Sequence, residues 1–196
     1  MEDAILINIS LTLAETKLDK KMCDDFVVAN HGYVASAKTV GRCMKYMIFN
    51  TEQFVGTFWL GSGFKPTPKD LLRHVGLSQS EFDKVFNEYA DNKRFCILPG
   101  IPNLGSQVLK QIRKTARQDW KNKYGDDLQG IVTTIGAGRT GAVYKADNWI
   151  QIGQTSGLQT DRKSVSMKWS DKETIQQRFV KPTGENKKLI FFTNNI

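Results

Sequence analysis

A polar loop between an apolar strand and a long basic helix is the stretch of this sequence best suited to bind an anionic ligand. The apolar run 95–98 ends at Pro99-Gly100, and loop 101–107 then opens into a helix predicted to end within 120–124. Backbone N–H groups without partners and the helix dipole both point at a ligand in such a position. The sequence therefore predicts a site for a phosphate-bearing molecule at this helix start.

The backbone of this loop supplies the predicted contacts. Gly105 would permit a close approach, and Lys110 and Arg113 would add positive charge one and two turns along the helix. The predicted contact residues are Leu98, Ile101, Asn103, Gly105, Ser106 and Gln107. The alternative is that Asn103 simply caps the helix.

The helix that follows carries a run of basic side chains that suits the phosphate backbone of DNA or tRNA. The run consists of Lys110, Arg113, Lys114, Arg117, Lys121 and Lys123. The net charge of +8 arises in the same half, because 1–105 hold 12 basic and 12 acidic residues and 106–196 hold 16 and 8. The alternative is a solvated basic face that serves solubility.

Two further polar segments hold side chains suited to chemistry on a base or an amine. In the break after the first predicted helix, a neutral His31 could remove a proton from an attacking amine, and Tyr33 could stack on a base. A loop histidine bonded to the backbone is an equal alternative. Asn148 suits bidentate recognition of adenine, or caps its helix.

Hydrophobic periodicity predicts the elements that position these residues. Period-two alternation predicts a strand at 5–13, and a four-residue connection predicts a hairpin of strands 40–49 and 54–60. Helices are predicted at 14–28, at 69–74 and from the capping box of Ser78 and Glu81 through Tyr89. Later strands are predicted at 131–135, 150–153, 165–169, 177–180 and 189–193. This mixture favours an α/β or α+β domain with a mixed sheet.

Length and composition favour one soluble domain. The chain has 196 residues and a mass of 22.2 kDa, and no apolar run approaches the roughly 20 residues that cross a bilayer. The start lacks the basic segment of a signal peptide. The scattered Cys23, Cys43 and Cys96 suggest reduced thiols in a cytoplasmic protein, and two histidines without nearby carboxylates give no metal motif.

The order of the predicted elements resembles the GNAT fold of acyltransferases. In that family a hairpin leads to a fourth strand that splays from the fifth, and the loop after the fourth strand binds the pyrophosphate of acyl-CoA. The resemblance implies an α/β (α+β) fold with a mixed, mostly antiparallel sheet, splayed central strands and flanking helices. It also implies acyl-CoA, or a related acyl or aminoacyl donor, as the cofactor in the cleft beside 98–107.

A closer resemblance is to proteins of the DruA type, a prokaryotic anti-phage defence component, and to the phage Mom family, whose GNAT-like members modify adenine in DNA. The resemblance covers roughly 25–160 of a single domain 1–196, and leaves 161–196 as a C-terminal extension of short strands. The residues that carry it are His31, Gly41-Arg42 to Tyr46, Asn92-Lys93-Arg94-Phe95-Cys96-Ile97-Leu98-Pro99, Pro102-Asn103-Leu104-Gly105-Ser106, Asp119-Trp120, Lys123-Tyr124-Gly125, Gly141-x-x-Tyr144-x-Ala146-x-Asn148-Trp149 and Ile152-Gly153-Gln154-Thr155-x-Gly157.

The resemblance also implies catalytic roles. Tyr144, on the helix after the fifth strand, would protonate a leaving thiolate, since an ordinary tyrosine pKa of about 10 keeps its hydroxyl protonated. The alternative is a buried tyrosine that anchors this helix. His31 and Tyr33 would lie at the acceptor. The acidic residue usual in the family after the fifth strand is absent from 133–138.

Three functions remain open. The first is a GNAT-like transferase, encoded by a phage or mobile element, that modifies a base amine in DNA, with adenine N6 as the expected acceptor. The second is a catalytically inactive nucleic-acid-binding or defence module on the same fold, which the missing acidic residue favours. The third is a GNAT enzyme for a small amine or a protein.

Overall fold

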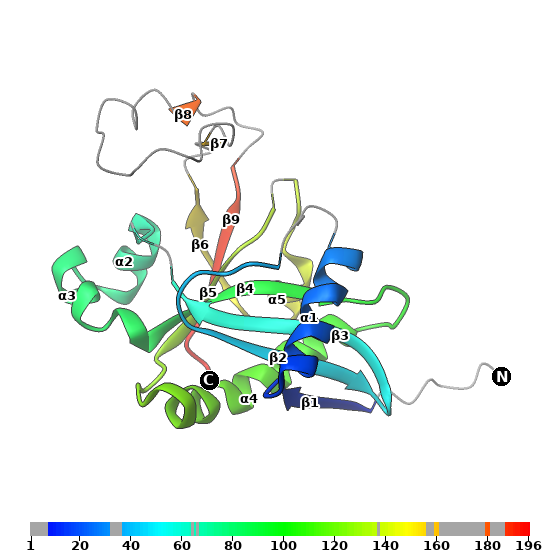
Figure 1. Ribbon diagram of the computed structural model, residues 1–196. Helices are drawn as coiled ribbons and strands as arrows, with labels where there is room; N and C mark the ends of the chain where they lie inside the picture. The colour runs from blue at the N-terminus through cyan, green and yellow to red at the C-terminus, as the bar shows by residue number, and fades with distance from the viewer. Residues whose placement is uncertain are drawn as a thin grey trace.

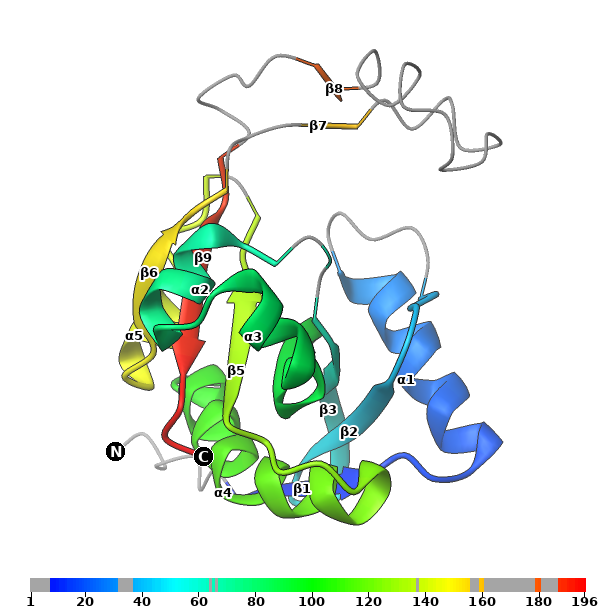
Figure 2. The ribbon, with the colours of Figure 1, turned by 90° about the vertical axis from the view of Figure 1, so that its left-hand side faces the viewer.

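A seven-stranded, mostly antiparallel sheet separates two layers of helices (Figures 1 and 2). The computed structural model describes residues 8–31, 37–63, 65, 67–136, 138–155, 159–160, 179–180 and 187–196. Across the sheet the strands are β1 (Ile9–Leu13), β2 (Cys43–Asn50), β3 (Gln53–Ser62), β4 (Tyr89–Ile97), β5 (Gly130–Thr134), β9 (Leu189–Thr193) and β6 (Ile150–Gln154). Two short strands, β7 (Gln159–Thr160) and β8 (Phe179–Val180), form a separate pair.

The predicted hairpin is confirmed as β2 and β3. Its turn is two residues long rather than four, because Asn50 already pairs with Gln53. Thr51 takes a positive φ of 58° in this turn. That left-handed conformation is typical of tight hairpin turns.

The sheet splits between β4 and β5. The two strands are parallel and pair only over Tyr89–Asp91, so the edge of β4 beyond Asp91 that faces β5 has no strand partner among the described residues. At the same point β4 carries a bulge, because Trp59 pairs with Arg94 and Leu60 with Asn92, which leaves Lys93 as the extra residue. A bulge re-aims the neighbouring side chains.

Helices cover both faces of the sheet. On one face lie α4 (Leu104–Tyr124) and α5 (Ala142–Ala146). On the other face, α1 (Lys17–Asn30) and the pair α2 (Lys69–Val75) and α3 (Gln79–Lys84) cover separate areas (Figure 2). The predicted long helix is confirmed as α4, whose apolar residues recur every three or four positions and are buried: Leu104, Val108, Leu109, Ile112, Ala116 and Trp120.

The prediction of one helix from Ser78 through Tyr89 is wrong. The capping box of Ser78 and Glu81 is present, but α3 ends at Lys84 and a single turn, η1 (Phe86–Glu88), follows. Tyr89 already belongs to β4, where it pairs with Gly130. The apolar spacing of this segment fits a helix, but long-range strand pairing determines its structure, and β4 is therefore much longer than the predicted run 95–98.

The predicted strand 189–193 is confirmed as β9 and belongs to the main sheet. This strand lies between β5 and β6 and pairs antiparallel with both. Its Phe191 is fully buried against the α4–α5 face, and Ile190 and Phe192 pack on the opposite face.

The predicted strand 165–169 and residues 5–7 of the first strand lie outside the described residues, and β8 coincides with the end of the predicted 177–180. None of the helices in the described ranges combines the length and apolar character needed to cross a bilayer.

Candidate functional site

The opening between β4 and β5 holds a cavity of about 620 Å³. Residues from both faces of the sheet line it, with Tyr144 of α5 on one side and His31, at the end of α1, on the other. The bulged residues of β4 form its floor, and Arg139 of the β5–α5 connection lies at its rim. The geometry therefore brings the two predicted catalytic residues to one cavity.

Tyr144 has its ring in the core and contributes to the wall of the cavity. The ring is 6% exposed and packs against Phe95, Trp149 and Phe191. Its Oη accepts a hydrogen bond of 2.9 Å from Nδ2 of Asn92. Tyr144 thus anchors α5, which agrees with the alternative of a buried structural tyrosine. Its hydroxyl also lies beside β4.

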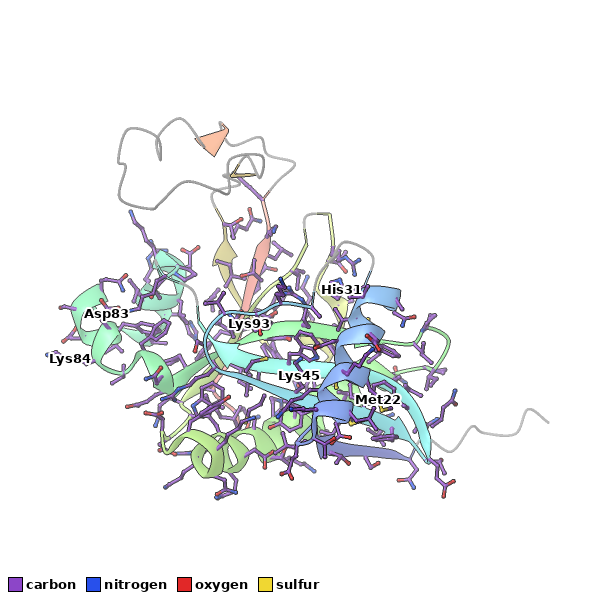
Figure 3. All side chains as sticks on the ribbon, viewed as in Figure 1. Met22, His31, Lys45, Asp83, Lys84 and Lys93 are labelled. Atoms are coloured by element: carbon purple, nitrogen blue, oxygen red, sulfur yellow. The ribbon has the colours of Figure 1, made fainter. Side chains whose placement is uncertain are left out.

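His31 ends α1, where its backbone N–H donates to the carbonyl of Val27 at 2.9 Å. Burial lowers the pKa of its imidazole, and the positive charges of Arg94 and Arg139 lower it further. The ring is therefore neutral at pH 7 and can accept a proton. Figure 3 shows His31 at the end of α1, away from the part of the helix that carries Met22.

Buried polar atoms without a hydrogen-bond partner gather on β4 at the bulge. Within the described ranges, Oδ1 of Asp91, Oδ1 of Asn92 and Nε of Arg94 are such atoms. Asn92 is 8% exposed and lines the cavity, as does Arg94. Native proteins rarely leave such groups unsatisfied, and Asn92 and Arg94 bring two of them to the wall of the cavity.

Asp91 is buried behind the cavity and faces Lys93. Its Oδ2 lies 3.3 Å from Nζ of Lys93, and both side chains are largely buried. Burial raises the pKa of Asp91 to about 6, against the attraction of Lys93. Asp91 and Asn92 were missed as site residues, although a polar run 91–94 directly before an apolar strand segment is a signal that could have identified them.

The predicted donor loop adjoins the cavity but does not line it. Gly105 is buried at the start of α4, and a Cβ there would lie 2.5 Å from Cγ2 of Val143, a cavity residue. In the described part of the chain, the N–H groups of Gly105 and Ser106 donate to no acceptor. Asn103 does not cap the helix through its side chain but takes a left-handed conformation with φ 56°.

The remaining predicted loop residues are packed or tied locally. Leu98 and Ile101 pack against the main core, and the Leu98 N–H donates to the carbonyl of Val55 at 2.8 Å. The N–H of Gln107 donates to the carbonyl of Asn103 and begins the helix. Among the predicted donor contacts, the backbone N–H groups of Gly105 and Ser106 are therefore the ones not engaged by described residues.

Two arginines of the basic helix are engaged within the protein. Arg113 forms a bidentate ion pair with Asp147, with Nε–Oδ2 at 2.7 Å and Nη2–Oδ1 at 2.8 Å, and donates to the carbonyl of Asn195. Arg117 forms a second bidentate pair with Asp127. Carboxylates engage both guanidinium groups in this structure, and a role of Arg113 or Arg117 as a phosphate ligand stays a prediction.

Lys110 and Lys114 are exposed on α4, and neither lines the cavity. Asn148 has a φ of 60° in the turn after α5 and is exposed. That conformation explains an asparagine at this position, and Asn148 does not line the cavity. Tyr33 lies outside the described residues.

A second cavity, of about 560 Å³, opens on the face that carries α1 and α3. It lies between the α1–β2 connection, the end of β3 and η1. Lys93 and Arg94 line both cavities. In Figure 3, Lys93 lies between α1, which carries Met22, and α3, which carries Asp83 and Lys84. No group of three or more side chains suited to hold a metal ion occurs in the ranges that were described.

The chain matches solved structures in fold and not in sequence. No protein-family model matches it, and no curated protein matches it. An N-acetyltransferase from Staphylococcus aureus Mu50 superimposes with a TM-score of 0.55 at 12% identity, over 96% of this chain and 98% of the other. An acetyltransferase from Bacillus subtilis in complex with CoA gives 0.55 at 8% identity, over 95% and 99%. FeeM, an N-acyl amino acid synthase from uncultured soil microbes, gives 0.51 at 10% identity, over 96% and 93%.

These matches, together with the strand order and the split between β4 and β5, confirm the predicted fold class. The chain has a GNAT-like fold, a mixed α+β sheet whose central strands splay. At such low identity the likeness establishes the fold alone.

Proposed function

We propose that the protein is an N-acyltransferase that uses acyl-CoA or a related acyl donor. The observation that carries the proposal is the position of the unsatisfied buried polar atoms. Asn92 and Arg94 carry two of them at the unpaired edge of β4, in one cavity with the Tyr144 hydroxyl and the neutral imidazole of His31.

The residues present fit an extended acyl-CoA. The edge of β4 beyond Asp91 offers backbone groups to an amide-bearing chain, in the way that one strand pairs with another. At the far end, beyond Val143, the N–H groups of Gly105 and Ser106 would meet phosphates. Acyl-CoA would supply an activated thioester carbonyl.

The two catalytic candidates divide the proton transfers. Asn92 donates to Oη of Tyr144, so towards Asn92 the tyrosine acts as acceptor and keeps its own O–H as a donor, and in the proposed reaction it gives this proton to the departing CoA thiolate. The neutral His31, on the other side of the opening, can accept the proton that an amine loses on acylation. Asn92 thereby orients the acid.

The finer part of the proposal concerns the acceptor, which we infer to be a base amine in nucleic acid, with adenine N6 in DNA as the first candidate. The net charge of +8 and the basic residues beside the cavity support a polyanionic partner. An exocyclic amine is a weak nucleophile, so the protein must position it, after the base has left the stack.

A nucleic-acid-binding module without catalysis is the second candidate. One observation favours it: no carboxylate occurs among the described residues that line the cavity between β4 and β5. A module of this kind would bind nucleic acid without being stabilised by an acyl donor.

The decisive experiment combines acetyl-CoA-induced thermal stabilisation with nucleoside mass spectrometry of DNA and RNA from expressing cells. The variants are Tyr144→Phe and the matched control Tyr124→Phe, which removes a hydroxyl from α4 away from the cavity. We expect stabilisation in all three proteins, and a new nucleoside mass that Tyr144→Phe reduces at least about 100-fold.

The other outcomes separate the candidates. A new mass unaffected by Tyr144→Phe retires Tyr144 as the acid but keeps the enzyme. Stabilisation by acetyl-CoA without any new nucleoside mass removes nucleic acid as the acceptor. Binding of nucleic acid without stabilisation by acetyl-CoA overturns the transferase in favour of the binding module.

A further inference from the structure

The second cavity is separate from the proposed donor cleft but touches it at the bulge of β4. Its walls come from the α1–β2 connection with Lys38 and Val40, from the end of β3, and from Phe86 of η1. Lys93 and Arg94 form the boundary with the first cavity. A molecule in the second cavity therefore lies next to the first cavity, which His31 and Tyr144 line, with Lys93 and Arg94 between them.

The walls of this cavity are positively charged. Lys38, Lys65, Lys93 and Arg94 line it, and no aspartate or glutamate is among its described lining residues. Asp91 lies behind Lys93 and compensates one charge from within the core. Asp83 approaches Lys65 at 3.3 Å on the exposed side. The charged side chains among the described lining residues are all basic, so the cavity would attract an anion.

An apolar surface lies beside these charges. The ring of Phe86 is half-buried, and Nζ of Lys65 lies 4.8 Å from its centroid. Gly63 faces the same ring, because a Cβ at this position would come within 3.5 Å of it. Val40 is 91% exposed in the opposite wall. A planar ring could rest between Phe86 and Val40 while an attached anion meets the basic side chains.

We propose that the second cavity binds a phosphate group of the acceptor together with its attached ring, so that the acceptor is a nucleotide, either free or within a polynucleotide. The identification of this molecule as the acceptor rests on the proposed acyltransferase function, whereas its binding does not. The route runs past Arg94, whose charge also acts on His31. The amine of the bound nucleotide is thereby directed to the donor cleft.

The test measures binding of two probes, a short fluorescein-labelled single-stranded DNA by anisotropy and deoxyadenosine monophosphate by competition. Lys38→Glu/Lys65→Glu changes two exposed lysines of the cavity, and Lys110→Glu/Lys114→Glu makes the same charge change on α4. We expect the cavity variant to lose about tenfold or more in affinity for both probes and to reduce the salt slope by about 2. The α4 variant should lose less than about threefold.

Each other result has a definite meaning. Equal losses in both variants would show general electrostatic attraction and overturn the proposal. A loss confined to the α4 variant would place the nucleic acid on α4 and also overturn it. Loss of the DNA probe without competition by the monophosphate identifies a polynucleotide as the ligand, and competition by the monophosphate identifies a nucleotide site.

Stabilisation by acetyl-CoA is measured on the same proteins. A cavity variant that retains it is folded and has an intact donor cleft, so its loss of probe binding is specific. Wild-type protein that binds both probes through the cavity but is not stabilised by acetyl-CoA would contradict the proposed function and leave the anion site standing.

Discussion

The two sides of the cavity between β4 and β5 differ in whether their buried polar groups have hydrogen-bond partners. On the α5 side, behind the residues that line the cavity, such groups are satisfied: Asp147 accepts from both Arg113 and the indole N–H of Trp149. The wall built from β4 leaves Oδ1 of Asn92 and Nε of Arg94 without hydrogen-bond partners. The α5 side is therefore a scaffold wall held by internal hydrogen bonds, whereas the β4 wall keeps polar groups that, under the proposed function, a ligand would engage.

Two buried aspartates make the same contrast. Asp147 is 5% exposed and is held by a bidentate arginine, which fixes α5 against α4. Asp91 is 1% exposed and has only a long contact to Lys93. A well-paired carboxylate contributes to the rigidity of the fold, whereas a poorly solvated one retains a proton more readily and suits a site that titrates.

The largest effect on stability should come from breaking the scaffold wall. Arg113→Ala leaves the buried carboxylate of Asp147 without its charge partner, so we expect a loss of about 3–5 kcal/mol in the free energy of unfolding. Urea denaturation measures this loss. Arg117→Ala is the matched control on the same helix, because its partner Asp127 forms an exposed pair, and its loss should be much smaller.

Equal losses in the two arginine variants would contradict the distinction between the walls. They would mean that Asp147 finds compensation from water or from Trp149 alone. A further check is Lys114→Ala, which removes an exposed lysine of α4 and should leave the unfolding curve nearly unchanged.

A second, intermediate effect is expected where α4 meets α5. A Cβ at Gly105 would lie 2.5 Å from Cγ2 of Val143, and the β-branched valine has little freedom to move away. Gly105→Ala should therefore cost about 1–3 kcal/mol, despite the better helix propensity of alanine. In Gly105→Ala/Val143→Ala the clash is removed, and the double mutant should be more stable than the two single losses added together.

The single variant Gly105→Ala also tests the prediction that Gly105 permits the close approach of a ligand. If Gly105→Ala alone is as stable as the wild type but is no longer stabilised by acetyl-CoA, the glycine is there for the approach of a ligand. If stability falls and stabilisation by the donor persists, the glycine is there for helix packing.

The elements with strong local signals were predictable from the sequence. The hairpin of β2 and β3, the amphipathic α4 and the capping box at Ser78 each depend on residues close together in the chain. The course of β4 and the central position of β9 depend on pairing with distant strands, which local periodicity does not encode. The error in the predicted course of β4 has this origin.

The candidate site divides in the same way. Tyr144 and His31 were identified because their residue types and their places after a strand and after a helix are visible in the sequence, and the structure brings them to one cavity. Asn92 was missed as a site residue because its role depends on a bulge and on a contact 52 positions away. The ion pair of Arg113 with Asp147 was not visible in the sequence, because the two residues are 34 positions apart.

A pH-dependent effect is expected from titrating Asp91 in the β4 wall. Burial raises the pKa of Asp91 to about 6 in the folded protein, above the ordinary value of 3.8. The folded state thus binds more protons than the unfolded state between about pH 4 and pH 6. Asp91 therefore makes the free energy of unfolding fall as the pH rises through this window, by at most about 1.4 kcal/mol per pH unit.

Asp91→Asn should remove this pH-dependent component. The difference between the wild-type and Asp91→Asn unfolding free energies should be greatest in favour of the wild type near pH 4 and level off above pH 6. Parallel profiles of the two proteins would mean that Asp91 is solvated or fully paired, and would remove the contrast with Asp147.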